Sequence, residues 1–205
     1  MPSSVIDICN LGLFRVGTKF TITDLEEGSA EANACKAVYD SARRSAMRAF
    51  PWNFATRYTT LAQAGTSPNP LKAYAYHEPS DCLLARRVMP DVVNGPTVPF
   101  ELIANAAGDG KLLLCDKSPA TLVYTFDATD PNLFDASFID AFSWRLGYEL
   151  ALPLTGDKGI QQSCLTVWRN FTPAAQALDA GEGDPDEVRE ADWITARTGA
   201  VNSWR

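Results

Sequence analysis

The sequence contains few of the residues that build metal or nucleophilic sites. It has one histidine, His77, and five cysteines without a Cys-x-x-Cys spacing among its 205 residues. Zinc sites need clustered ligands, and a Cys–His or Ser–His pair would have to use this histidine. The cysteines are odd in number and far apart, which predicts buried thiols in a reducing compartment. They are Cys9, Cys35, Cys82, Cys115 and Cys164. We expect no metal site and no cofactor.

Long apolar runs are also missing. No stretch approaches the ~18 continuous apolar residues of a membrane span. The first residues lack the basic and apolar regions of a secretory signal. With 46% hydrophobic and 21% charged residues, the composition is typical of a globular chain. We expect a protein made in the cytoplasm, with no membrane partner.

Basic residues are fewer than acidic residues, and one segment accounts for most of the negative net charge. The chain has 18 basic and 25 acidic residues, a formal net charge of −7. Residues 179–192 alone hold seven carboxylates and one arginine, or −6. Such blocks are usually solvated and often act as interaction tails, and no basic nucleic-acid footprint is present. We expect Arg43, Arg44 and Arg48, and the pair Arg86–Arg87, to lie on solvated or ion-paired faces.

Apolar periodicity and helix-capping residues predict two helices before a strand-rich region and two or three after it. Ser3 or Ser4 caps the first helix and Gly17 stops it, whereas Ser29 caps a second that runs to Phe50. Later helices cover 134–153 and 157–181, with Pro173 expected to kink or restart the last. Short β-rich pieces separated by turn residues lie between the helix pairs. The predicted strands are 54–61, 73–77, 83–89, 98–104, 111–115 and 121–126.

This order predicts an α+β protein. Residues 1–52 and 131–180 form a helical bundle domain, into which 53–130 inserts as an antiparallel β-sandwich or barrel-like domain. Residues 181–205 form an extended acidic C-terminal docking tail. Pro51 ends the second helix because it lacks an amide donor, and Trp52 and Phe54 are expected to anchor the domain junction.

No catalytic constellation stands out. The segment 107–112 resembles a phosphate loop but lacks its first glycine and its Ser or Thr, and Asp109-Gly110 predicts a hairpin instead. A glycosidase needs two facing carboxylates, and Glu78, Asp81 and Glu101 have no geometry fixed by the sequence. His77 is expected to end a tyrosine-rich strand.

The acidic segment is followed by large aromatic and basic residues. Such residues on a polar terminal segment predict docking onto another surface. The alternative is that they fold back on the core of their own chain. The candidate interaction residues are Trp193, Ile194, Arg197, Trp204 and Arg205.

Several segments together resemble one known family, the tail tubular protein A or head-to-tail adaptor of short-tailed bacteriophages. The similarity covers nearly the whole chain and is most specific in the Pro-Trp-Asn-Phe-Ala segment. The matching pieces are Thr23-Asp24-Leu25-Glu26-Glu27, Ala34-Cys35, Tyr39-Asp40-Ser41-Ala42-Arg43, Phe50-Pro51-Trp52-Asn53-Phe54-Ala55, Leu61-Ala62, Tyr74-Ala75-Tyr76, Pro79-Ser80-Asp81-Cys82-Leu83 and Trp193-Ile194-Thr195-Ala196-Arg197.

The resemblance implies a non-enzymatic virion protein of the tail or neck. It implies a ring, dodecameric in the family, between the portal protein and a tail nozzle similar to tubular protein B. The C-terminal segment would grip the portal or a neighbouring subunit. Genomic DNA would pass through without sequence-specific binding, which suits a near-neutral to acidic subunit.

Two other classes of function stay open. One is a peptidoglycan-degrading enzyme carried in the tail, and the other is a generic cytosolic α+β binding module. Binding to a portal particle separates both from an adaptor.

Overall fold

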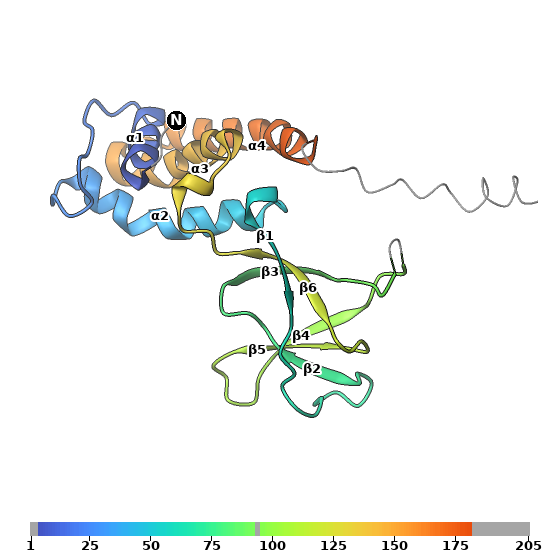
Figure 1. Cartoon of the computed structure of the whole chain (residues 1–205). Helices are drawn as coiled ribbons and strands as arrows, with labels where there is room; N and C mark the ends of the chain where they lie inside the picture. The colour runs from blue at the N-terminus through green and yellow to red at the C-terminus, as the bar shows by residue number, and fades with distance from the viewer. Residues whose placement is uncertain (1–3, 93–94, 182–205) are drawn as a thin grey trace, which may run out of the picture.

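The chain combines a group of helices with two small sheets. We describe a computed structural model, in which residues 4–92 and 95–181 are placed (Figure 1). The helices are α1 Val5–Arg15, α2 Ala30–Arg48, α3 Ala136–Thr155 and α4 Lys158–Gly181. All strands of the described residues lie between α2 and α3, so the predicted α+β class is confirmed.

Helix starts follow the predicted caps. The Ser4 hydroxyl accepts a hydrogen bond from the backbone amide of Asp7, and the Ser29 hydroxyl accepts one from the backbone amide of Ala32. Gly17 follows α1 with a φ of 77°, a left-handed conformation that favours glycine at this position. Helix α2 ends at Arg48, two residues before the predicted Phe50. The residue before a proline is pushed out of helical conformation, which accounts for an earlier end.

The helix end expected at Pro153 is wrong. Helix α3 runs past Pro153 to Thr155, and Gly156 then stops it with a φ of 66°. Helix α4 does not restart at Pro173 but continues to Gly181, and the other alternative, a kink at Pro173, stays a prediction. The helix bond that Pro173 cannot make is the one to the Arg169 carbonyl, four residues earlier. Extensive packing of α4 against α3 outweighs this missing amide.

The strands form two three-stranded antiparallel sheets, ordered β1-β6-β3 and β2-β5-β4. All six predicted strands are present. Strands β1 and β4 each begin two residues later than predicted, β1 because Asn53–Ala55 forms a 3-10 turn. Hairpin pairing of β4 with β5 confirms the Asp109-Gly110 prediction. The strands are β1 Thr56–Thr60, β2 Tyr74–His77, β3 Cys82–Val88, β4 Phe100–Ala104, β5 Lys111–Cys115 and β6 Thr121–Phe126.

Helix α3 is the centre of the helical part and contacts α1, α2 and α4. Its buried stripe includes Phe138, Phe142, Leu146 and Leu150, each 0% exposed. The core continues into the sheets through residues such as Tyr124. Within residues 4–92 and 95–181, none of the helices combines the length and apolarity needed to cross a lipid bilayer.

Helices α1 and α3 approach closely at two glycines. A Cβ on Gly12 would lie 2.9 Å from Leu146 Cδ2, and one on Gly147 would lie 3.0 Å from Arg15 Cβ. The absence of both side chains lets the two helices pack together.

We predict that Gly12→Val destabilises the fold by about 1–3 kcal/mol, because the added methyl groups must displace Leu146. The matched control is Phe14→Val on the same helix, where the native ring is 63% exposed and the expected change is within about 0.5 kcal/mol. Denaturant unfolding of both variants measures the difference. Equal unfolding midpoints would contradict a tight α1–α3 contact.

Candidate functional site

The junction between helices and strands is the most densely connected polar and aromatic region of the structure. It is built around the Pro-Trp-Asn-Phe-Ala segment. Trp52 is 1% exposed, and its indole N–H donates to the Ala46 carbonyl at 3.2 Å. Its ring centroid lies 5.1 Å from Phe138 of α3 and 6.3 Å from half-buried Phe54. Pro51 is exposed and lies after the end of α2.

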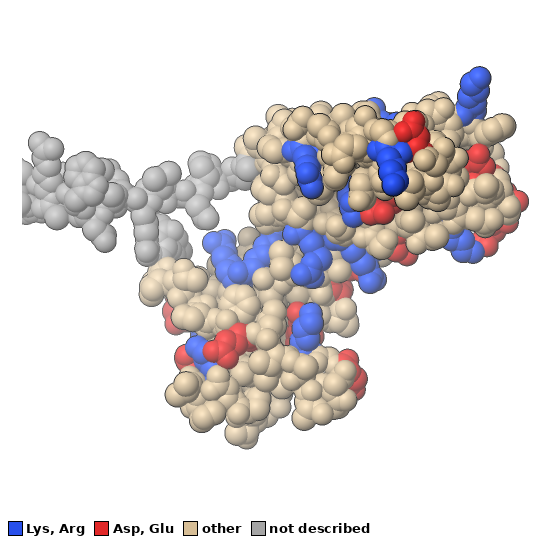
Figure 2. Space-filling view, turned by 180° about the vertical axis from the view of Figure 1, so that it is seen from behind, with Lys and Arg blue, Asp and Glu red and all other residues tan. Residues whose placement is uncertain are grey.

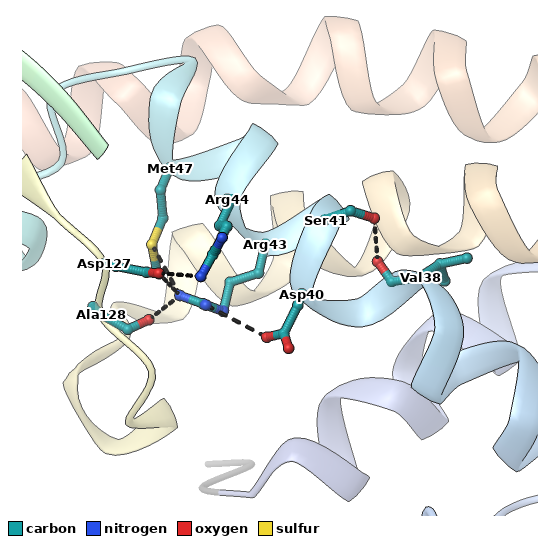
Figure 3. A network of polar contacts seen from close by, with 8 residues as sticks. All are labelled: Val38, Asp40, Ser41, Arg43, Arg44, Met47, Asp127 and Ala128. Atoms are coloured by element: carbon teal, nitrogen blue, oxygen red, sulfur yellow. Dashed lines mark hydrogen bonds and ion pairs between the residues drawn. The ribbon is translucent and has the colours of Figure 1, made fainter. Parts of the chain in front are cut away.

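A buried arginine ties α2 to the segment after β6. Arg43 is 1% exposed, and its guanidinium donates to Asp127 Oδ1 and to the Ala128 carbonyl, both at 2.5 Å (Figure 3). Arg44 pairs with the other Asp127 oxygen at 2.8 Å, so one carboxylate joins two arginines of α2. Asp40 adds a weaker, 3.4 Å contact to Arg43. Arg43 was expected on a solvated or ion-paired face, and the ion-paired alternative is the correct one.

The end of α4 is fixed to the same junction. Asp179 is 5% exposed, and its carboxylate accepts the backbone amide of Asn53 at 3.0 Å. The Asn53 side-chain amide also donates to the Asp179 carbonyl oxygen. The sequence analysis counted Asp179 with the solvated acidic block, and this assignment is wrong. Nothing in the local sequence distinguishes it from the carboxylates that follow, since its partner lies 126 residues away.

Basic side chains gather where the helices meet the strands (Figure 2). Arg86 of β3 is half-buried and donates to Thr125 Oγ1 at 2.9 Å and to Thr56 Oγ1 at 2.8 Å. Burial lowers the pKa of Arg86, whereas the nearby Asp179 acts in the opposite sense. Arg57 pairs with Asp81 at 2.6 Å. The arginines of α2, β1 and β3 at this junction are Arg43, Arg44, Arg48, Arg57, Arg86 and Arg87.

The residues considered for hydrolysis have structural partners. Glu78 lies 3.3 Å from Lys111, and Glu101 accepts the Asn69 side-chain amide at 3.0 Å. Asp81 accepts the Tyr124 hydroxyl at 3.0 Å in addition to pairing with Arg57. Each of the three carboxylates therefore has its own structural partner. None of these contacts directs two of them toward one substrate-binding position.

The thiols have the environment of packing residues. Cys82 is half-buried, and burial together with Glu78 raises its pKa to about 12. A nucleophilic cysteine needs the opposite shift. His77 is exposed at the end of β2, where its register partner is Leu112. All five cysteines are free, and no cluster of metal-ligating residues occurs in the described part of the chain.

The predicted interaction residues of the tail lie outside the described residues. They are Trp193, Ile194, Arg197, Trp204 and Arg205. Of the candidates from the sequence, the structure brings together Trp52 and Phe54 with Pro51 beside them. Sequence reasoning missed Asn53 and Asp127, both of which act through partners far away in the chain.

No protein-family model matches the chain, and no curated protein matches it significantly.

We predict that Trp52→Ala lowers stability by about 3–5 kcal/mol, because it removes a buried ring that packs between Phe138 and Phe50. Tyr58→Ala is the control, since that ring is 60% exposed. Thermal melting followed by circular dichroism compares the two. A melt unchanged by Trp52→Ala would refute the role of this ring as the junction anchor.

We predict that Asp127→Asn costs about 3–5 kcal/mol, because it leaves the buried Arg43 charge without its main counter-ion. Asp40→Asn should cost less than about 1 kcal/mol, since the Asp40 side chain is 80% exposed. Urea unfolding of the wild type and both variants gives the free energies. Similar losses in the two variants would show that Asp127 has no special role in the junction.

Proposed function

We propose that this protein is a structural head-to-tail adaptor of a short-tailed bacteriophage, forming a ring between portal and tail nozzle. In this proposal the helices form a bundle domain and the strands an inserted β-sandwich. The C-terminal tail reaches the portal or a neighbouring subunit. Packaged DNA passes through the ring without sequence-specific binding.

The main support for the proposal is the contact that holds the end of α4, just before the tail, against the junction. Asp179, two residues before the end of α4, is buried and bonded to Asn53. The 24 residues from 182 to 205 therefore leave from a defined point of the junction. An adaptor must connect a rigid body to another component of the particle, and an anchored segment ending in tryptophans and arginines is suited to this. The anchoring residue Asn53 belongs to the Pro-Trp-Asn-Phe-Ala segment in which the adaptor resemblance is most specific.

Ring formation needs two different patches on each subunit, because cyclic contacts are heterologous. Large exposed apolar residues occur at separated positions. Phe14 and Phe20 are 63% and 70% exposed at the end of α1, and Leu71 is 83% exposed before β2. Phe14 also lines a cavity of about 460 Å³ with Trp144 and Ile160. Exposed apolar side chains of this kind are suited to contacts between subunits. The region of Phe14 is therefore a candidate for one side of the ring interface.

The enzyme alternative has weaker support. A wall-degrading hydrolase would require paired carboxylates or an activated nucleophile. Glu78, Asp81 and Glu101 engage separate partners, and the Cys82 thiol is protonated at neutral pH. The adaptor is therefore the function that the described geometry favours.

The test is assembly on a purified portal. We expect the isolated protein to be largely monomeric and to form rings only with portal, where neighbouring subunits are held at high effective concentration. Light scattering and electron microscopy with and without portal report the result. Closed rings without portal would contradict templating, and no ring in either case would refute the adaptor proposal.

Truncation at residue 181 locates the docking element. The shortened protein should keep the melting behaviour of the folded body and lose portal attachment. Trp193→Ala should weaken attachment far more than Asp186→Asn, since buried aromatic side chains supply most contact energy. Normal attachment of the truncated protein would assign docking to the helical body instead.

A further inference from the structure

One face of the β1-β6-β3 sheet combines positive charge with an exposed aromatic ring. In the strand register Tyr58 of β1 pairs with Val123 of β6, which pairs with Arg87 of β3, so the three residues form one row across the sheet. Arg86 lies beside this row at a β-bulge and bonds to Thr56 and Thr125. Tyr58 is 60% exposed, and Arg87 is also exposed. We call Tyr58, Arg86 and Arg87 the arginine face.

The end of α4 lies next to the arginine face. The Arg86 guanidinium lies 3.4 Å from the Trp52 carbonyl, and the amide of the same peptide group, Asn53 N–H, donates to Asp179 at 3.0 Å. Asp179 is itself held by Asn53, which lies three residues before β1. Gly181, the last described residue, follows Asp179 by two positions, so the described chain ends close to Asn53 and Arg86.

The chain that follows has the opposite charge. Residues 182–192 contain six carboxylates and one arginine, a net charge of −5. Crossing three strands requires two inter-strand spacings, about 10 Å. Six extended residues span about 20 Å, so the first half of this segment is long enough to lie across the sheet.

We propose that the acidic segment 182–192 docks in cis on the arginine face of its own sheet. Carboxylates of the segment pair with Arg86 and Arg87, and the backbone packs over Tyr58. The tail is thereby divided into a part held against its own subunit and a part, 193–205, that carries the tryptophans. This inference does not depend on the adaptor role, because it concerns the isolated chain.

The affinity of such contacts is low per pair, and the short connection provides a high local concentration. Exposed ion pairs are individually weak and are screened by salt. A segment that starts beside its site is held at an effective concentration in the millimolar range. We therefore expect about three- to tenfold slowing of amide hydrogen exchange in 182–192, and loss of this protection in about 1 M salt.

Hydrogen exchange of the full-length protein tests the proposal. The reference is a synthetic peptide of residues 182–205 under the same conditions. Arg87→Glu should raise the exchange rates of 182–192 to those of the peptide. Lys19→Glu is the control, because it makes the same charge change at an exposed position between α1 and α2. It should leave the protection unchanged.

A second variant removes four of the six carboxylates of segment 182–192 and leaves the folded body untouched. Replacing Glu182, Asp184, Asp186 and Glu187 by their amides should also abolish protection, with an unchanged melting temperature. Wild-type exchange at peptide rates in low salt would overturn the proposal, as would protection that survives both variants. Protection that grows with protein concentration would assign the contact to a second copy and overturn docking in cis.

Discussion

The buried ion pair between Arg43 and Asp127 is the interaction on which the arrangement of the molecule depends. Arg43 is nearly inaccessible to water, and its charge is balanced by a carboxylate just beyond the last strand. Burying an arginine is costly unless its charge is neutralised. Asp127 and the Ala128 carbonyl supply this for the terminal nitrogens of Arg43, although its Nε has no partner among the described residues. The pair therefore requires the end of β6 to lie against α2.

Local sequence signals predicted the elements well because each depends on neighbouring residues. The Ser4 and Ser29 caps, the Gly17 stop and the Asp109-Gly110 hairpin involve atoms a few residues apart. The end expected at Pro153 and the restart considered at Pro173 are both absent, because packing between α3 and α4 offsets a locally unfavourable residue. Propensity is a weak guide where tertiary contacts are extensive.

The candidate site was predictable only in part. The sequence pattern changes from helix-type to strand-type after Pro51, which located the junction. The large apolar side chain of Trp52 indicated a residue that anchors it. The contacts of Asp127 with Arg43 and of Asp179 with Asn53 join residues 84 and 126 positions apart. A single sequence gives no signal for such pairings. Asp179 stands first in the acidic segment 179–192, and its neighbours in the sequence gave no sign that it is buried and bonded. The carboxylates after it remain candidates for binding another surface.

The way the strands connect to the helices has a mechanical consequence. The chain enters β1 at Thr56 and leaves β6 near Thr125, and these two residues are direct partners in the sheet. A force that pulls the strands away from the helices would therefore act on β1 and β6 at the same end of the sheet. It would break the hydrogen-bonded pairs between these two strands one after another, starting at Thr56 and Thr125. Arg86 lies at this first pair, bonded to both threonine hydroxyls and 3.4 Å from the Trp52 carbonyl. Its guanidinium would therefore be among the first contacts to bear such a force, together with the Arg43–Asp127 pair and the Asn53–Asp179 hydrogen bond.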